Sequence, residues 1–141
     1  MKVVINDCYG GFGLSAKAVK WIADKQGKPC FFFKRGFDDA TGHGVYKLTD
    51  GIPDGGWSDF WIASTVNNSN EIDYKTNVLT SRYEEEHRHD PLLVEAVETL
   101  GNEANGACAK LKIVDIPDGV DYIIGEHDGI EWVAERHRNW N

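Results

Sequence analysis

Residues 8–15 read CYGGFGLS, and this segment has the residue types of an anion-binding loop. Glycines leave backbone N–H groups uncovered, and a helix that begins directly after such a loop places the positive end of its dipole behind them. Lys17 is near enough in sequence to assist. The segment is therefore a candidate phosphate cradle.

The same glycines have two other interpretations. A tight strand-to-helix connection also uses glycine, for positive φ and for close packing. Residues 11–16, GFGLSA, fit the dinucleotide pattern G-x-G-x-x-G/A. However, a dinucleotide fold needs a second helix after the next strand, and no helical pattern appears there for about fifty residues. The pattern of a nucleotide-binding P-loop, G-x-x-x-x-G-K-[ST], is not matched.

Two aromatic residues in the segment, Tyr9 and Phe12, are not needed to hold a phosphate. Aromatic rings stack on nucleobases, so the pair could bind the base of a nucleotide. Packing in the core explains at least one of them equally well.

The segment EEEHRHD, residues 84–90, is the candidate for metal or acid–base chemistry. His87 and His89 form an H-x-H pair, but the spacing of a dinuclear hydrolase fails because Pro91 takes the position of the next acid. No other metal pattern is present, and Cys8 is the one nucleophile beside the loop. We therefore expect no metal, no cofactor and no catalytic centre, which favours a binding protein.

The charge and length of the chain limit its partners. A net charge of −8 argues against binding long nucleic acids, which requires many phosphates to be neutralised. Residues 1–36 nevertheless hold seven Lys and Arg against two acidic residues, so a small phosphorylated ligand could bind at this end. This excess is also what an ordinary solvated helix face shows.

The 141 residues fit a single domain. No apolar run approaches the length of a membrane helix, and we expect a soluble protein without membrane contact that stays in the cytoplasm. Three widely spaced cysteines are interpreted as reduced thiols, mostly in the core.

The periodicity of the sequence predicts the elements that position these residues. Helices are expected where apolar residues recur every three or four positions between a cap and a glycine, and strands where β-branched or aromatic runs end at Gly or Pro. The expected helices are 14–27 and 90–101, and the expected strands are 3–6, 30–35, 45–48, 60–65, 74–80 and 109–117.

The last part, YIIGEHDGIEWVAERH, predicts a hairpin with its turn at Asp128 and Gly129, although Ile130–His137 could instead form a short helix. Together the elements predict an α+β fold in which a mixed, largely antiparallel sheet is covered by two helices.

Four strings in the sequence resemble one phage protein family: CYGGFGLS, RHDPLLVEAVETLG, ANGACAKLKIVDIPDGVDY and EHDGIEWVAERHRNW. The family is the first type of Thoeris anti-defense protein, the sponges that sequester cyclic ADP-ribose isomers made by bacterial TIR-domain sensors. The resemblance covers residues 1–35 and 82–141. The segment 37–81 has no counterpart and is interpreted as a variable insertion.

The resemblance implies a homo-oligomer, a dimer or a higher assembly such as a hexamer, that acts in the cytoplasm of the host cell. It implies that the protein binds a cyclic ADP-ribose isomer or a related cyclic nucleotide without cleaving it. Cyclic oligonucleotides at a separate site, and with them an effect on CBASS immunity, belong to the same expectation.

The resemblance and the residue types together give a set of expected ligand contacts. Arginines are included because the planar guanidinium donates two hydrogen bonds at once to a phosphate. Each of the residues outside the loop could instead be a surface charge or a turn residue. The set is Tyr9, Gly10, Gly11, Phe12, Gly13, Leu14, Ser15, Lys17, Arg88, Asn105, Arg136 and Arg138.

Two other classes of function remain open from the sequence. The chain could be a small phosphodiesterase or nucleotide hydrolase that uses His87, His89 and nearby acids. It could also be a protein-interaction module without a small ligand, whose surface is marked by tryptophans 57, 61, 132 and 140.

Overall fold

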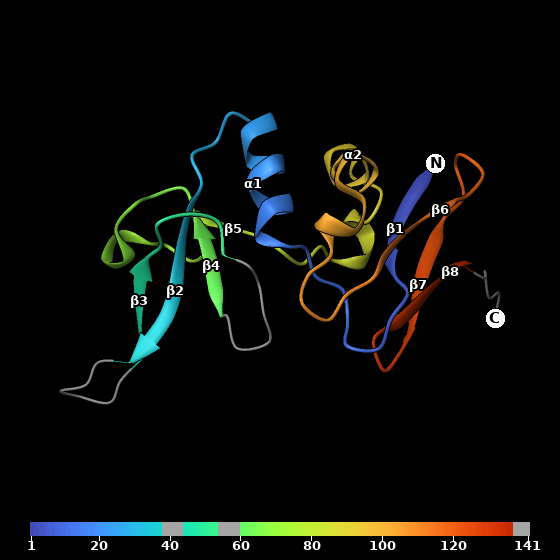
Figure 1. Ribbon diagram of the computed structural model, residues 1–141. Coiled ribbons are helices and arrows are strands. Elements are labelled where there is room, and N and C mark those ends of the chain that lie inside the picture. The colour runs from blue at the N-terminus through green and yellow to red at the C-terminus, as the bar shows by residue number, and fades with distance from the viewer. Residues whose placement is uncertain (38–43, 54–59, 137–141) are drawn as a thin grey trace, which may run out of the picture.

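The computed structural model describes residues 1–37, 44–53 and 60–136. In these residues two helices and eight strands follow one another in the order β1, α1, β2, β3, β4, β5, α2, β6, β7, β8 (Figure 1). The helices are α1 (Ala16–Lys25) and α2 (Pro91–Leu100). The strands are β1 (Lys2–Asn6), β2 (Phe31–Phe37), β3 (Gly44–Leu48), β4 (Trp61–Ser64), β5 (Val78–Leu79), β6 (Leu111–Asp115), β7 (Tyr122–His127) and β8 (Ile130–Glu135).

The strands form three antiparallel sheets. β1 pairs with β6, β7 pairs with β8, and the third sheet has the order β3-β2-β4-β5. This confirms the predicted α+β class with two helices, although the predicted single sheet is divided and no parallel pair occurs among the described strands. The division arises because β2 pairs with β3 and β4, which follow it along the chain, while β1 pairs with a segment more than a hundred residues away.

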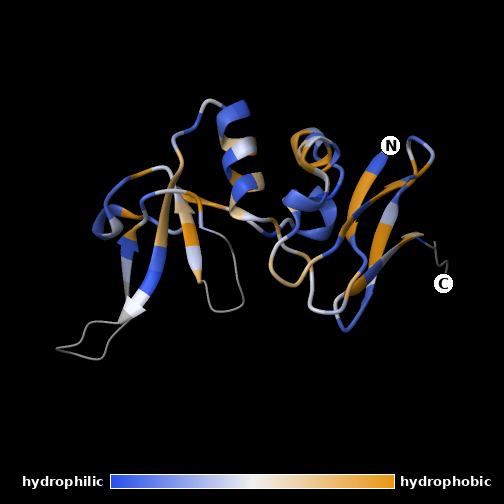
Figure 2. Cartoon of the chain, in the orientation of Figure 1, coloured by the Kyte–Doolittle hydropathy of each residue, from blue (hydrophilic) through white to orange (hydrophobic). Residues whose placement is uncertain are grey.

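The two helices lie between the sheets. In Figure 1 the four-stranded sheet and α1 occupy one side of the molecule, and β1, β6, β7 and β8 occupy the other, with α2 between them. The helices pack against each other, and α2 also contacts β1 and β6. The main core accordingly combines apolar residues of both helices, of β1 and of the four-stranded sheet. Figure 2 shows hydrophobic residues on α2 and on the neighbouring β1.

Strand β1 is buried on both of its faces, which explains why it reads as a continuous apolar run. Val4 belongs to the main core with Val19 of α1 and Leu93 of α2. Val3 and Ile5 point to the opposite face and pack with Ile124 of β7. Because successive side chains of β1 point to opposite faces, this strand packs against both the main core and the C-terminal hairpin.

Both helices begin at the capping residues that the sequence indicates. Ser15 precedes α1, and its Oγ accepts a hydrogen bond from the N–H of Ala18 at 3.1 Å. Asp90 caps α2 with Pro91 at the first helical position, and α2 ends at Gly101, whose φ is 58°. The helix was predicted from residue 14 but begins two residues later, at Ala16. Leu14 lies before the cap and donates its N–H to the carbonyl of Ser81.

The C-terminal hairpin turns at Asp128 and Gly129, with φ values of 50° and 95°. Its second strand, β8, shows that the alternative of a helix from residue 130 is wrong, because the turn directs the chain back along β7. The predicted strand at 74–80 is reduced to the two residues of β5. No helix within the described part of the chain is long and apolar enough to cross a membrane.

Candidate ligand-binding cleft

A cleft of about 410 Å³ opens beside the glycine loop. This volume lies within the range of about 300–1,000 Å³ that small-molecule sites occupy. The glycine loop and a second segment after α2 line one wall, and residues of the four-stranded sheet with their neighbours along the chain line the other. The lining residues are Gly10, Gly11, Phe12, Gly13, Leu14, Arg35, Tyr46, Phe60, Trp61, Ser81, Arg82, Gly106, Ala107, Cys108 and Ala109.

Packing and backbone conformation explain two of the three glycines of the loop. Gly10 has a φ of 122°, and a Cβ atom there would lie 2.7 Å from the Cβ of Cys108. Gly11 has a φ of 99°, which L-residues rarely adopt. The turn of the hairpin packs tightly against the same loop, because a Cβ on Gly129 would lie 2.4 Å from the nitrogen of Gly11.

Gly13 has no such explanation. Its φ lies outside the left-handed region, and a Cβ atom built on it meets no atom within 4 Å. It lines the cleft, so the missing side chain leaves room in the cleft itself. A glycine that neither turn geometry nor packing requires is typical of a place where a ligand approaches the backbone.

Three consecutive backbone N–H groups of the loop have no acceptor in the part of the chain that the structure describes. The N–H of Gly10 donates to the carbonyl of Asp128, and the N–H of Leu14 donates to the carbonyl of Ser81. Between them, no described residue accepts a hydrogen bond from the N–H of Gly11, Phe12 or Gly13. Successive backbone amides without acceptors are the donors of an anion-binding nest, and these three belong to residues that line the cleft.

The opposite wall supplies positive charge and aromatic rings. Arg35 and Arg82 are exposed, and neither guanidinium forms an ion pair or hydrogen bond with a described residue. Trp61 is half-buried and contacts Phe32 edge to face, with ring centroids 5.5 Å apart. The Phe60 ring is 66% exposed. The cleft therefore offers charged forks for phosphates and ring surfaces for a base.

The structure brings one part of the expected ligand contacts together. Gly10, Gly11, Phe12, Gly13 and Leu14 all line the cleft. Tyr9, at the start of the loop, is 68% exposed and does not line it.

Ser15 and Lys17 do not line the cleft and have other partners. The Ser15 hydroxyl caps α1 and donates to the carbonyl of Glu103 at 2.6 Å. The Lys17 ammonium pairs with the Glu103 carboxylate at 3.0 Å.

The remaining expected contacts also lie elsewhere. Asn105 accepts a hydrogen bond from the N–H of Leu111 at 2.8 Å, so its side chain holds a turn. Arg136 is exposed and lies 3.2 Å from the carboxylate of Asp121. Arg138 is outside the described residues, as are Trp57 and Trp140.

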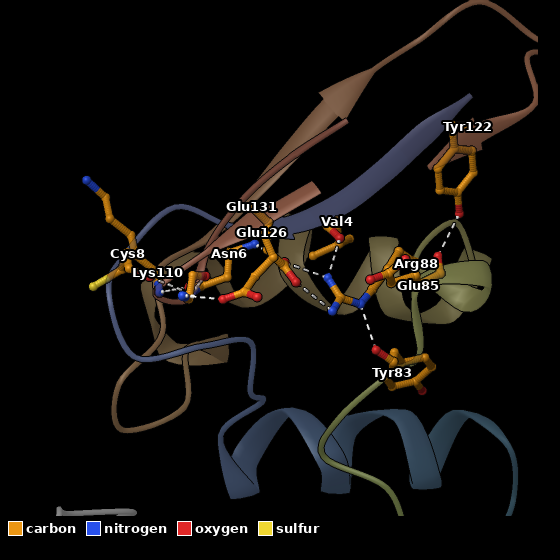
Figure 3. Close-up of polar contacts among 11 residues, drawn as sticks. Val4, Asn6, Cys8, Tyr83, Glu85, Arg88, Lys110, Tyr122, Glu126 and Glu131 are labelled. Atoms are coloured by element: carbon orange, nitrogen blue, oxygen red, sulfur yellow. Dashed lines mark hydrogen bonds and ion pairs between the residues drawn. The ribbon is translucent and has the colours of Figure 1, made fainter. Parts of the chain in front are cut away.

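Arg88 is buried rather than presented to the cleft. It is 5% exposed and forms a two-point ion pair with Glu131, itself 8% exposed, at 2.7 and 2.9 Å. Its Nε donates to the carbonyl of Tyr83 at 2.7 Å, and Figure 3 shows the guanidinium held among these groups and Val4. The guanidinium carbon lies 3.7 Å from the centre of the Phe12 ring.

The histidines of EEEHRHD do not line the cleft. The Nδ1 of His89 lies 2.7 Å from the hydroxyl of Tyr122, and His87 is exposed at the end of a short 3-10 turn, Glu85–His87. No group of three His, Cys, Asp or Glu placed to hold a metal ion is found in the part of the chain that the structure describes.

The side chains whose pKa values shift lie outside the cleft. Burial raises the pKa of the Cys30 thiol to about 11, and the nearby Lys20 opposes the shift. Burial likewise raises the pKa of Tyr83, with a further contribution from Asp90, and that of Tyr122. All three cysteines are unpaired and half-buried, and Cys108 lines the cleft.

Sequence reasoning missed the wall opposite the glycine loop. Arg35 was counted in the basic N-terminal segment, and Trp61 was noted only as a surface tryptophan, whereas Phe60, Ser81 and Arg82 carried no local signal. Strand pairing brings these residues to the loop. In the segment 106–109, which follows Asn105, the only local signal was Gly106, because a glycine can mark a close approach of two backbone segments.

Comparison of the chain with protein-family models, with curated proteins and with solved structures finds no match. A functional assignment therefore depends on the chemistry of the cleft and on the resemblance in the sequence.

Proposed function

We propose that the chain is a phage anti-defense sponge that binds a cyclic ADP-ribose isomer in this cleft and releases it unchanged. The observation that carries the proposal is that Gly11, Phe12 and Gly13, whose N–H groups have no acceptor among the described residues, line the same cleft as Arg35 and Arg82. A pyrophosphate bound to the amides and the two guanidinium groups would have its charge matched from both sides. The resemblance of four sequence strings to the sponge family supports the same ligand class.

The aromatic residues of the cleft complete the ligand class. A cyclic nucleotide presents an adenine beside its phosphates, and Trp61 and Phe60 supply ring faces in the same wall as the arginines. Stacking of a base on an aromatic side chain contributes about 1–3 kcal/mol. Cyclic oligonucleotides carry the same two chemical groups and are the second ligand class for this proposal.

Sequestration requires tight binding of the signal and no catalysis. The free signal must fall below the level that activates its receptor in the host cytoplasm, so we expect nanomolar binding, about −12 kcal/mol. We also expect a homo-oligomer, in which a second copy shields the bound ligand from solvent. Hydrolysis is not part of the proposal, and His87 and His89 lie away from the cleft.

The test separates a sponge from an enzyme and from a protein without a small ligand. The purified protein is incubated with a cyclic ADP-ribose isomer and filtered, and the retained protein is denatured by heat. The filtrate and the heat-released fraction are then chromatographed. We expect ligand to be missing from the filtrate and recovered intact after heating.

Conversion to a new species would make the protein a hydrolase and contradict the proposal. The variant H87A/H89A would then identify the reacting residues, whereas a sponge keeps its affinity in that variant. If this isomer and cyclic oligonucleotides both remain in the filtrate at micromolar concentrations, the proposal is wrong. The protein-interaction class of function then remains.

A further inference from the structure

The glycine loop has fixed ends and a middle that depends on one side chain. At the start, the Asn6 amide donates to the carbonyls of Cys8 and Gly129, both at 2.7 Å. At the end, the carbonyl of Gly13 accepts from Gly106 and the N–H of Leu14 donates to Ser81. Between these anchors, the side chain of Phe12 holds the loop: its ring packs against the main core, and its centre lies 3.7 Å from the guanidinium carbon of Arg88.

The guanidinium under Phe12 is itself fixed from several directions. Its NH1 donates to Glu131 and, at 3.3 Å, to the carbonyl of Val4, while NH2 donates to the second oxygen of Glu131. Glu131 is oriented in turn by the backbone N–H of Asn6, which donates to it at 2.7 Å. These bonds hold the plane of the guanidinium, and a planar cation below a ring favours one position of that ring.

We infer that Arg88 is a positioning residue of the cleft, which sets the row of unpaired amides through Phe12. This inference rests on the proposed function, because it assigns to Arg88 a role in affinity without contact to the ligand. Phe12 links Arg88 to the cleft, since its ring lies on Arg88 and it also lines the cleft. Glu131 and Asn6 act on the loop through Arg88: Glu131 binds the guanidinium, and the backbone N–H of Asn6 binds Glu131 (Figure 3).

A double-mutant cycle tests this role against a merely structural one. Phe12→Leu keeps an apolar side chain and leaves the ion pair intact, while Arg88→Lys keeps the charge opposite Glu131 and loses the planar face. We expect each single variant to lower the affinity for the ligand about tenfold, because a cation–π contact between the exposed and the fully desolvated limits contributes about 1–2 kcal/mol. The double variant should be no weaker than the weaker single variant, because both remove one shared contact.

Lys25→Ala is the matched control, since it removes a cation that lies 5.1 Å from the centre of the Trp21 ring, outside the cleft, and should keep the affinity within about twofold. Multiplication of the two single effects in the double variant would overturn the inference. So would a Phe12→Leu variant that binds as tightly as the parent protein.

A measurement without ligand keeps the inference testable if the proposed function fails. The Nε–Hε signal of Arg88, assigned by NMR, should show the shielding of a proton near an aromatic ring and should lose it in Phe12→Leu. The Cys108 thiol, beside Gly10 in the cleft, should become several times faster to alkylate in Phe12→Leu, with its rate read by peptide mass mapping.

The two proposals therefore fail in different ways. If the parent protein binds no nucleotide, the proposed function is wrong, and the signal of Arg88 and the rate at Cys108 still decide the positioning role. If the parent protein binds but the Arg88 signal and the Cys108 rate do not respond to Phe12→Leu, the positioning role is wrong. This readout also covers the case in which Arg88→Lys does not fold.

Discussion

The carbonyl oxygen of Gly13 accepts a hydrogen bond from the N–H of Gly106 at 2.8 Å, and a Cβ atom on Gly106 would lie 2.8 Å from the same oxygen. The two segments thus approach each other backbone to backbone, although they lie 93 positions apart in the sequence. Both line the cleft, so their contact determines the shape of one wall.

Gly106→Ala should destabilise the protein, because the added methyl group meets backbone atoms that cannot move aside as a side chain would. Overpacking of this kind costs about 1–3 kcal/mol of unfolding free energy. Urea denaturation measures the change. Gly36→Ala is the matched control, since a Cβ there meets nothing within 4 Å; equal stability losses in the two variants would contradict the explanation.

Gly13→Ala should fold normally and bind ligand poorly. The position has open space and no left-handed φ, so the folded state tolerates a methyl group, and reduced freedom of the unfolded chain adds about 0.4–1 kcal/mol of stability. The methyl group would stand between the ligand and the unpaired amides. Calorimetric titration should show at least about a tenfold loss of affinity, and an unchanged affinity would remove Gly13 from the site.

Arg35→Gln and Arg82→Gln should each weaken binding while leaving the fold intact. A charge-assisted hydrogen bond contributes about 1.5–3 kcal/mol, so a loss of about tenfold or more is expected, together with a weaker dependence of affinity on salt. Arg136→Gln is the control, because that arginine is also exposed but pairs with Asp121 outside the cleft. A similar loss in the control would indicate long-range attraction rather than contact.

Asp90→Ala should lower stability through the start of α2. The carboxylate accepts hydrogen bonds from the N–H of Leu92 at 2.9 Å and of Leu93 at 3.3 Å, and loss of such a cap costs about 1 kcal/mol. In a chain of this length the melting temperature should fall by about 2–4 °C. Glu95→Ala, on the exposed face of the same helix, should change it much less.

The Cys30 thiol should be protected from alkylation in the folded protein. Its pKa, raised by burial from 9.0 to about 11, leaves far less thiolate at pH 8.5 than in the unfolded chain. Because the folded pKa is the higher one, stability falls as pH rises from 9 toward 11. Iodoacetamide labelling of Cys30 with and without urea, followed by mass mapping, checks this, and equal rates would contradict it.

Local signals in the sequence were sufficient for most elements. Ser15, Asp90, Pro91 and Gly101 marked the helix ends, and the pair Asp128 and Gly129 marked the hairpin, because capping and turn geometry depend on neighbouring residues. Sheet pairing was not predictable in the same way. The partner of β1 lies at Leu111–Asp115, and nothing in either segment specifies the other.

The candidate site shows the same limit. The glycine loop was visible because its chemistry lies in adjacent residues, whereas the opposite wall is assembled from Arg35, Trp61 and Arg82 only when the chain folds. Arg88 was expected to contact the ligand, with a surface charge as the alternative, and it is buried instead. Its burial depends on Glu131, which lies 43 positions away and balances its charge.

The ion pair of Arg88 with Glu131, and the bond from Asn6 to Gly129, also set an order of events during protein synthesis. β1 leaves the ribosome first, yet its polar partners are among the last residues described. At about 5–20 residues per second, translation takes several seconds to supply them. The cleft cannot take its final form before then, so a chain truncated ahead of the hairpin would lack the contacts with Gly129 and Glu131 that hold one end of the glycine loop and Arg88.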